Sequence, residues 1–443
     1  MFSNKDLRKL IIPLVIEQLL AVTIGMADTV MVSSCGEAAV SGISLVDSIN
    51  FLLITLFSSL ATGGAVIASQ YIGRGDHKSA SLAAKQLFYA SLALSAVLGV
   101  IAVFFRKPVL NMVFGSIEAD VMAHAQIYFL LSAISYPFLA VYNAGAALFR
   151  SMGDSRTTML ISILMNTINI VGNAILIYGF QMAAAGAATA SLVSRAVGAI
   201  IITVLLLNPR RIIFYDKLHK PEIHLSMLKS ILQIGGPNGL ENSIFQIGKI
   251  LVASIVSGFG TISITANAVA GNLASLQVIP GMALGMAMIT VVGQCIGAKD
   301  YEAVKKYTKK LMLITYGVVW AMTLLMLLFS KQILSFYSLS EETTTMTMEV
   351  FIVHGICAVI VWPLAFALPN ALRAANDVRF TMIVSLLSMW IFRIGFSYIL
   401  AIYFNMGILG TWIAMCIDWF CRGACFVIRF ARGKWKNISF IDN

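Results

Sequence analysis

A single carboxylate lies inside a long apolar stretch near the start of the chain. Asp28 stands in Gly25-Met-Ala-Asp-Thr29, towards the end of an apolar segment that covers residues 8–32. An ionisable group inside a membrane span costs about 2.5–3.5 kcal/mol on insertion scales, so such a group is a functional candidate. A carboxylate in a partly dry cavity can bind and release a proton near physiological pH, or bind a sodium ion or a cationic substrate. The structural alternatives are a cap on a broken helix and a carboxylate near the outer surface.

Three asparagines form a ladder in another apolar segment, at Asn166, Asn169 and Asn173. Asn169 and Asn173 are four residues apart, so they share one face of a helix. Amide oxygens suit an ion or a proton carrier as partners. The alternative is that the asparagines hold helices together, at roughly 0.6 kcal/mol per hydrogen bond. Because Asp28 lies in the same half of the chain, we treat Asn169 and Asn173 as candidate ion-coupling residues.

Two glutamates in apolar segments each follow a proline by four residues. Glu17 follows Pro13, and Glu241 follows Pro237. A proline early in a span frees backbone carbonyls and bends the helix, so we predict helix bends at both prolines. Because the pair occurs twice, a structural role is favoured, and both glutamates are also candidates for the wall of a cavity. Glu17 faces the same side of its helix as Asp28, since eleven residues are about three turns.

The remaining buried charges are mostly basic. Lys249 lies eight residues after Glu241, roughly two helical turns, so the two side chains can form an ion pair. Arg393 has no local partner and requires a carboxylate from elsewhere, for which Glu241 is a candidate. We assign Lys249 and Arg393 to the cavity wall. Asp418 and Arg422 are spaced as a structural ion pair on one helix.

No arrangement of residues in the sequence is typical of an enzyme. The chain contains no phosphate-binding loop, no His-Glu-x-x-His and no Gly-x-Ser-x-Gly. The five histidines are scattered, and the six cysteines lie mostly in apolar segments, where they serve as small apolar fillers. We therefore expect no catalysis, no metal and no cofactor, and the energy for any transport should come from an ion gradient.

The elements that position these residues are membrane-spanning helices. The chain of 443 residues is 59% hydrophobic and 12% charged, whereas soluble domains carry about 25% charged residues. Apolar runs of about 20 residues, the length that crosses a bilayer as a helix, recur twelve times. They cover residues 8–32, 47–70, 86–105, 122–143, 157–179, 185–207, 232–257, 268–292, 310–330, 347–370, 381–403 and 408–430. The sequence therefore predicts an all-α integral membrane protein with twelve transmembrane helices.

The chain consists of two copies of one module. The segment Gln70-x-Ile-Gly-x-x-Asp76 recurs as Gln294-x-Ile-Gly-x-x-Asp300, 224 positions later. The same shift, or one of 223, relates further pairs: Pro13 and Pro237, Glu17 and Glu241, Gly186 and Gly410, and Arg150 and Arg373. Six spans per copy is an even number, so the two repeats enter the membrane in the same sense. Such a duplication usually builds a transport path at the interface between the copies.

The repeated Ile-Gly-x-x-Asp element is predicted to be a helix stop rather than a binding site. We expect its glycine to supply a left-handed turn and its aspartate to cap the next helix. A second repeated set consists of Arg150, Asp154 and Arg156 in the first copy and Arg373, Asp377 and Arg379 in the second. We interpret both as structural turns with ion pairs at the inner face.

The distribution of positive charge predicts the topology. Of the 31 Lys and Arg residues, 24 fall in the two tails and the even-numbered connections, and three fall in the odd-numbered connections. This asymmetry places both termini in the cytoplasm and explains the net charge of +11 without a nucleic-acid partner. We divide the chain into residues 1–207, a basic cytoplasmic linker at 208–228, and residues 229–443.

The motifs together resemble the multidrug and toxic compound extrusion (MATE) family, and most closely its bacterial DinF-like branch. They are Pro13 with Met26-Ala-Asp28-Thr-Val-Met31, the Gln70 element with its repeat, Leu148-Phe-Arg-Ser-Met-Gly-Asp154, and Leu372-Arg-Ala-Ala-Asn-Asp377. The resemblance implies two six-helix lobes around a V-shaped central cavity. It also implies alternating access and export of cationic or amphipathic compounds in exchange for H⁺ or Na⁺.

The resemblance also implies roles for individual residues. Asp28 matches the coupling carboxylate of the first lobe, and Asn169 matches its polar partner. Ser191 stands where members of the family often place a threonine. Pro13 matches the point at which the first span bends on protonation.

Two positions depart from the family pattern. Asn173 stands where many DinF-like members carry a second acid, and Asn370 stands where some NorM-like members carry an acid. A lone carboxylate coordinates sodium poorly compared with a pair. We therefore favour proton coupling over sodium coupling.

We consequently expect a secondary active multidrug efflux antiporter in the cytoplasmic membrane, acting as a monomer on small organic cations or amphipathic drugs. The alternative within transport is a flippase for lipid-linked precursors, whose cavity should be strongly cationic to hold pyrophosphate. An intramembrane enzyme is the third hypothesis, but no catalytic set converges in the spans.

Overall fold

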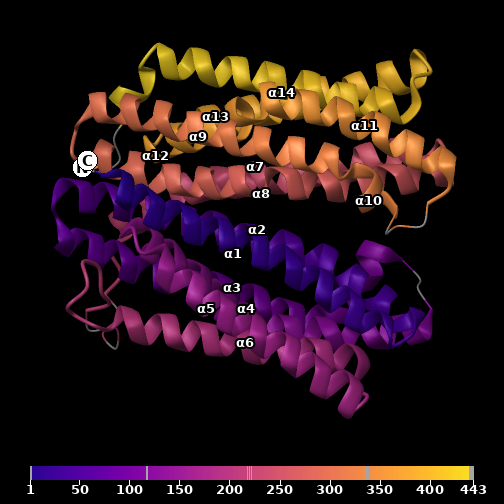
Figure 1. Cartoon of the computed structure of the whole chain (residues 1–443). Helices are drawn as coiled ribbons and strands as arrows, with labels where there is room; N and C mark the ends of the chain where they lie inside the picture. The colour runs from indigo at the N-terminus through magenta and orange to yellow at the C-terminus, as the bar shows by residue number, and fades with distance from the viewer. Residues whose placement is uncertain are drawn as a thin grey trace. The chain divides into compact units, whose positions relative to one another are not determined.

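Long helices make up nearly all of the described chain, and no strand occurs in that part (Figure 1). The computed structural model describes residues 2–115, 118–216, 218, 220, 222–335, 337 and 339–438. Among these residues, 11 helices are long and apolar enough to cross a membrane, one for each expected span after the first. The first expected span falls in α1 (Asn4–Ser33). The predicted all-α membrane class is confirmed.

The chain divides into two compact units, Met1–Gly239 and Leu240–Asn443. The helices of unit 1 are α1, α2 (Glu37–Arg74), α3 (His77–Phe114), α4 (Ala119–Ser151), α5 (Ser155–Asn173), η1 (Ala174–Gly179) and α6 (Ala183–Leu206). Helix α4 is central, because it contacts α2, α3 and α6, while α1 packs on α5. The buried rings of Phe57 and Tyr136 lie 6.0 Å apart in the core between α2 and α4.

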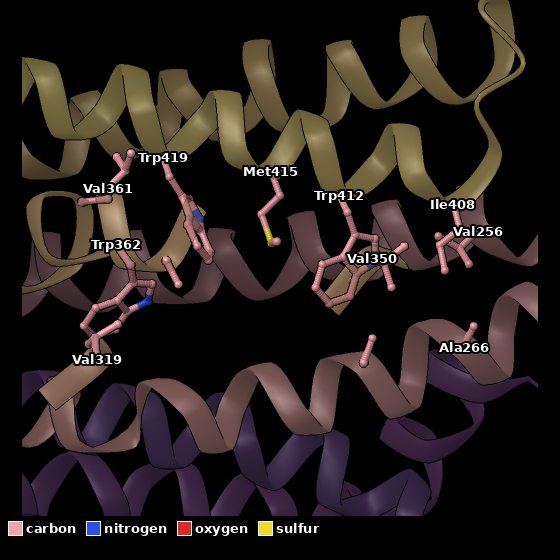
Figure 2. Close-up of a cluster of buried hydrophobic side chains, with 13 residues drawn as sticks. Val256, Ala266, Val319, Val350, Val361, Trp362, Ile408, Trp412, Met415 and Trp419 are labelled. Carbon is pink, nitrogen blue, oxygen red and sulfur yellow. The ribbon is translucent and has the colours of Figure 1, made fainter. Parts of the chain in front are cut away.

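Unit 2 begins within α7 (Leu225–Ser257). Its further helices are α8 (Thr261–Gly297), α9 (Tyr301–Leu328), α10 (Ser330–Ser335), α11 (Glu341–Ile360), η2 (Pro363–Ala367), α12 (Leu368–Ala374), α13 (Val378–Ser388), η3 (Met389–Gly395), η4 (Tyr398–Tyr403), α14 (Gly407–Ala431) and η5 (Lys434–Asn437). Trp412, Met415 and Trp419 project from one face of α14 into a buried apolar cluster (Figure 2). Their spacing of three and four residues explains this shared face.

The repeat is visible in local structure as well as in sequence. The π-helical segment η1 covers residues 174–179, and η4 covers 398–403, again 224 positions later. Gly186 and Gly410 follow these segments at equivalent positions. A Cβ on Gly186 would lie 3.2 Å from the Leu176 backbone, and a Cβ on Gly410 would lie 2.7 Å from the Ala401 nitrogen. Both glycines therefore permit the close helix approach that small residues provide in membranes.

The Ile-Gly-x-x-Asp elements end one helix and cap the next. Asp76 accepts a hydrogen bond from the Ser79 nitrogen at 3.0 Å, and Asp300 accepts one from the Ala303 nitrogen at 2.9 Å. The hydrogen bonds from Ser79 lower the pKa of Asp76, so this cap stays charged at neutral pH. The predicted position of the left-handed turn is wrong, however. The repeated glycines are helical, and the left-handed residues are Gly75 and Lys299, two positions later, where the chain leaves the helix.

The described part of the linker predicted at residues 208–228 is held against α3. Gln86 donates to the Glu222 carbonyl at 2.7 Å and accepts from the His224 nitrogen at 3.1 Å. The Tyr89 hydroxyl donates to the Leu218 carbonyl at 2.8 Å. Side chains of one helix thus satisfy backbone groups of the connecting segment.

Candidate functional site

The four predicted ion-coupling residues form one hydrogen-bonded chain in unit 1. Asp28 lies on α1, Asn169 and Asn173 on α5, and Ser191 on α6. The Asn173 amide Nδ2 donates to Asp28 Oδ1 over 2.6 Å and to Asn169 Oδ1 over 3.3 Å. Asn169 Nδ2 in turn donates to Ser191 Oγ over 3.0 Å. Residues up to 163 positions apart (28 to 191) therefore converge at one place.

Asn173 is the central member of this chain. Its side chain is fully buried, and its Oδ1 has no hydrogen-bond partner among the described residues. An amide carries two donors on one side and an acceptor on the other. The donor side, which faces Asp28 here, suits a charged carboxylate. Half a turn of the amide would present the oxygen instead, which suits a protonated carboxyl group or a bound cation.

A second carboxylate, Asp47 on α2, lies in the same electrostatic neighbourhood, since Asp28 and Asp47 interact. Asp47 Oδ1 accepts hydrogen bonds from the Tyr128 hydroxyl at 3.0 Å and from Asn50 Nδ2 at 3.2 Å. Sequence analysis missed Asp47 because the second span was predicted to begin at residue 47. Helix α2 begins ten residues earlier, at Glu37, so Asp47 lies well inside the helix. The acidic residue at the edge of an apolar run was the available signal.

Arg195 supplies the opposing charge in this neighbourhood. It interacts electrostatically with both Asp28 and Asp47. Its Nη1 donates to Ser135 Oγ over 2.7 Å. One guanidinium interacts with two carboxylates, so these three groups carry a net charge of −1 when both acids are ionised. Uptake of one cation would make the group neutral, which is the state that a low-dielectric site favours.

The glutamates that were candidates for a cavity wall form equivalent ion pairs in the two units. Arg150 Nη1 lies 3.3 Å from Glu17 Oε1, and Thr158 Oγ1 donates to Glu17 Oε2 at 2.9 Å. Arg373 Nη2 lies 2.8 Å from Glu241 Oε1. The four charged side chains are each less than one fifth exposed. Glu17 corresponds to Glu241 and Arg150 to Arg373 in the repeat, so the same ion pair is present in both units. This geometry supports the structural role that the sequence favoured.

Arg393 requires a carboxylate partner, as the sequence indicated, but the candidate Glu241 is wrong. Glu241 is held by Arg373, whose Nη1 also donates to Asn370 Oδ1 at 2.9 Å. Arg393 instead faces Asp418, with its Nη1 3.9 Å from Asp418 Oδ2. Asn370, which stands where some NorM-like members carry an acid, is therefore joined to the pair of Glu241 and Arg373.

Basic side chains of unit 2 gather around one aromatic ring, that of Phe245 on α7. The Lys249 Nζ lies 5.8 Å from the ring centroid, and the guanidinium carbons of Arg393 and Arg422 each lie 5.5 Å from it. The predicted pair of Asp418 and Arg422 is confirmed, with an Nη2–Oδ1 distance of 3.1 Å. We call these five residues the Phe245 cluster. Cation–π contacts of this kind contribute about 0.5–2 kcal/mol each.

The predicted helix bends are not marked by a break. Pro13 lies inside α1 and Pro237 inside α7, and each helix continues through its proline. Within the described residues, no group of three or more His, Cys, Asp or Glu side chains could hold a metal ion, and the six cysteines are free thiols.

Comparison with known proteins gives a consistent result. A model of the MatE family matches the chain twice, over residues 13–175 and 237–399. Both bounds of the second match are 224 greater than those of the first, which confirms the repeat. Similar proteins include the uncharacterized transporter YisQ of Bacillus subtilis, 26% identical over 96% of this chain and 93% of its own. The probable multidrug resistance protein NorM of Bacillus cereus is 29% identical over 95% of this chain and 93% of its own.

Solved structures show the same fold. A MATE protein in a bent conformation has a TM-score of 0.88 at 20% identity, covering 97% of this chain and 94% of that chain. An outward-facing multidrug resistance MATE transporter of the MOP superfamily has a TM-score of 0.89 at 20% identity, covering 98% and 97%. The resemblance carried by the sequence motifs is thus confirmed, and the chain belongs to the MatE family of multi-pass membrane transporters.

Proposed function

We propose that the protein is a secondary active antiporter that exports cationic or amphipathic organic compounds in exchange for protons, by alternating access. Asp28 is the residue that takes the coupling proton. Sodium is the alternative coupling ion. The protein acts as a monomer in the cytoplasmic membrane with both termini in the cytoplasm, and it needs no bound cofactor.

The observation that carries this proposal is the chain from Asp28 through Asn173 and Asn169 to Ser191. A carboxylate that is half-buried in a membrane helix is costly unless it has a use. The Asn173 amide can serve both protonation states of the carboxylate, because it offers donors and an acceptor. Protonation can therefore exchange the hydrogen bond from Asn173 Nδ2 for one that the carboxyl O–H donates to Asn173 Oδ1, which has no partner among the described residues.

Proton uptake is coupled to export if the proton and the substrate favour different conformations of the protein and the protonation of Asp28 decides between them. A ligand shifts a two-state equilibrium only by its differential affinity for the two states. A proton on Asp28 changes the charge of the group that includes Asp47 and Arg195 from −1 to zero. The conformation with the drier site is then favoured, and return of the proton to water reverses this preference.

A proton is favoured over sodium by the ligands present. Sodium, like other hard cations, needs several oxygen ligands. Asp28 has an amide beside it at position 173 rather than a second acid, and Asp47 Oδ1 already accepts two hydrogen bonds.

The test is dye transport in proteoliposomes under an imposed pH gradient or an imposed sodium gradient. Wild type is compared with Asp28→Asn and with Glu37→Gln, which removes an exposed carboxylate at the end of α2 as a matched control. We expect a cationic dye to move under the pH gradient in wild type and in the control. We expect Asp28→Asn to remain folded and to lose gradient-driven movement.

Each other outcome has a defined meaning. Driven export by Asp28→Asn would remove Asp28 from the mechanism. Movement under the sodium gradient alone would change the coupling ion and make Asn173 Oδ1 a candidate ligand. No dye movement in folded protein would favour the lipid-linked precursor flippase, to which the basic Phe245 cluster lends support.

A further inference from the structure

The two units carry opposite chemistry at equivalent positions. Adding the repeat shift of 224 to Asn169 gives Arg393, and adding it to Asp28 gives Val252. Unit 2 therefore has an apolar residue in place of the coupling carboxylate. A guanidinium lies at or next to the position of its amide partner, because the shift changes from 223 at Arg150 to 224 at Ala174. The shift also relates Gly25 to Lys249, which adds a second positive charge. The framework is duplicated, but the charge is reversed.

The only carboxylate in the Phe245 cluster is already committed. Asp418 is fully buried and accepts hydrogen bonds from Arg422 Nη2 at 3.1 and 3.2 Å and from the Ser388 hydroxyl. Arg393 lies farther away, at 3.9 Å, beyond hydrogen-bond distance. The five residues together carry a net charge of +2, since three cations face one anion.

Several buried donors of this cluster lack an acceptor. Arg393 is 9% exposed and Arg422 is 3% exposed, and the Nε of each has no hydrogen-bond partner among the described residues. The indole Nε1 of Trp419, which packs on Phe366 beside Arg422, is also unpartnered in the described part of the chain. The Phe245 ring attracts the cations but accepts no strong hydrogen bond from them. An arrangement with spare donors and spare positive charge favours an anionic acceptor.

We propose that the Phe245 cluster binds an acidic group of the transported compound, so that the substrates include amphipathic carboxylates and zwitterions. Arg393 and Lys249 bind the carboxylate, and Phe245 and Phe366 provide apolar contact for the adjoining part of the compound. Arg422 is held by Asp418 and fixes the position of the ring. This inference rests on the proposed export function and narrows its substrate class.

The test is equilibrium binding to the purified full-length protein in neutral detergent, measured by fluorescence anisotropy without any ion gradient. The probes are rhodamine B, which carries a free carboxylate at neutral pH, and its ethyl ester, which does not. Both share the same cationic ring system. We expect wild type to bind the free acid about tenfold more tightly than the ester, as one charge-assisted contact provides.

In Lys249→Gln and in Arg393→Gln, the ratio of the Kd of the ester to the Kd of the free acid should fall from about ten to about one. Lys331→Gln is the matched control, because it removes an exposed lysine of α10 outside the cluster and should retain the preference. Lys249 is exposed and donates no hydrogen bond within the described residues, so its replacement should not impair folding even if Arg393→Gln does.

Equal affinity of wild type for the two dyes, or no binding of the free acid, would overturn the proposal. An unchanged preference of folded Lys249→Gln for the free acid over the ester would also overturn the proposal. Because binding is measured without a gradient, these results do not depend on coupled export. Failure of export with a retained preference for the acid would instead refute the proposed function alone.

Discussion

Removal of Arg373 should destabilise the protein more than removal of its repeat counterpart, Arg150. Arg373→Ala leaves the Glu241 carboxylate, 8% exposed, without any partner that the described structure provides. Breaking a buried pair in this way costs about 3–5 kcal/mol. Arg150→Ala leaves Glu17 with the Thr158 hydroxyl at 2.9 Å. A hydrogen bond to a charged group contributes about 1.5–3 kcal/mol, so the second variant should lose less stability by roughly that amount.

Thermal unfolding in detergent, followed by tryptophan fluorescence, measures this difference. For units of this size, Arg373→Ala should unfold about 5 °C below Arg150→Ala. The double variant Arg373→Ala/Glu241→Gln should recover most of the loss, because a neutral amide tolerates burial better than an unpaired carboxylate. Equal Tm values for the two single variants, or no recovery in the double variant, would refute the reasoning.

Three further predictions concern the site and the repeat. Asn169→Ala should weaken proton-driven dye export several-fold and leave Tm within a few degrees of the wild-type value. A change in Tm with unchanged export would show that Asn169 only holds helices together. Asn173→Asp places a second acid 2.6 Å from Asp28, so sodium should now drive or stabilise export, as assayed with a sodium gradient. Gly410→Val should reduce Tm and folded yield, because the valine side chain would meet the Ala401 backbone. A Tm equal to that of wild type would show that α14 and η4 can move apart without loss of stability.

The sequence predicted the framework because its signals are local and repeated. Apolar runs identify the spans, and the duplicated Ile-Gly-x-x-Asp elements identify the helix ends, with Asp76 and Asp300 as caps. The left-handed turn was assigned to the wrong residue because the copies differ there. Gly75 takes the left-handed conformation in the first copy and Lys299 in the second, so the repeated glycine was a misleading guide.

The partners of buried charges could not be predicted in the same way. Asp28, Asn169, Asn173 and Ser191 could be grouped before the structure was known because the family resemblance joins positions on separate helices, and the structure brings their side chains together. Without such a guide, Arg393 was paired with Glu241, although Arg373 and Asp418 provide the actual contacts. Which faces of two helices meet depends on packing, and spacing along the chain does not contain that information.

The divergence between the copies separates positions that support the fold from positions that act on ligands. The Glu–Arg pairs, the aspartate caps, the π-helical segments and the close-packed glycines occur in both units. Asp28 and Asn169 do not, since Val252 stands at the position of Asp28, and Phe392 or Arg393 stands at that of Asn169. A buried charge kept in both copies satisfies a need that both copies share, which is structural. A buried charge present in one copy alone is not required by the common framework, and its cost in the membrane must be offset by a function specific to that unit.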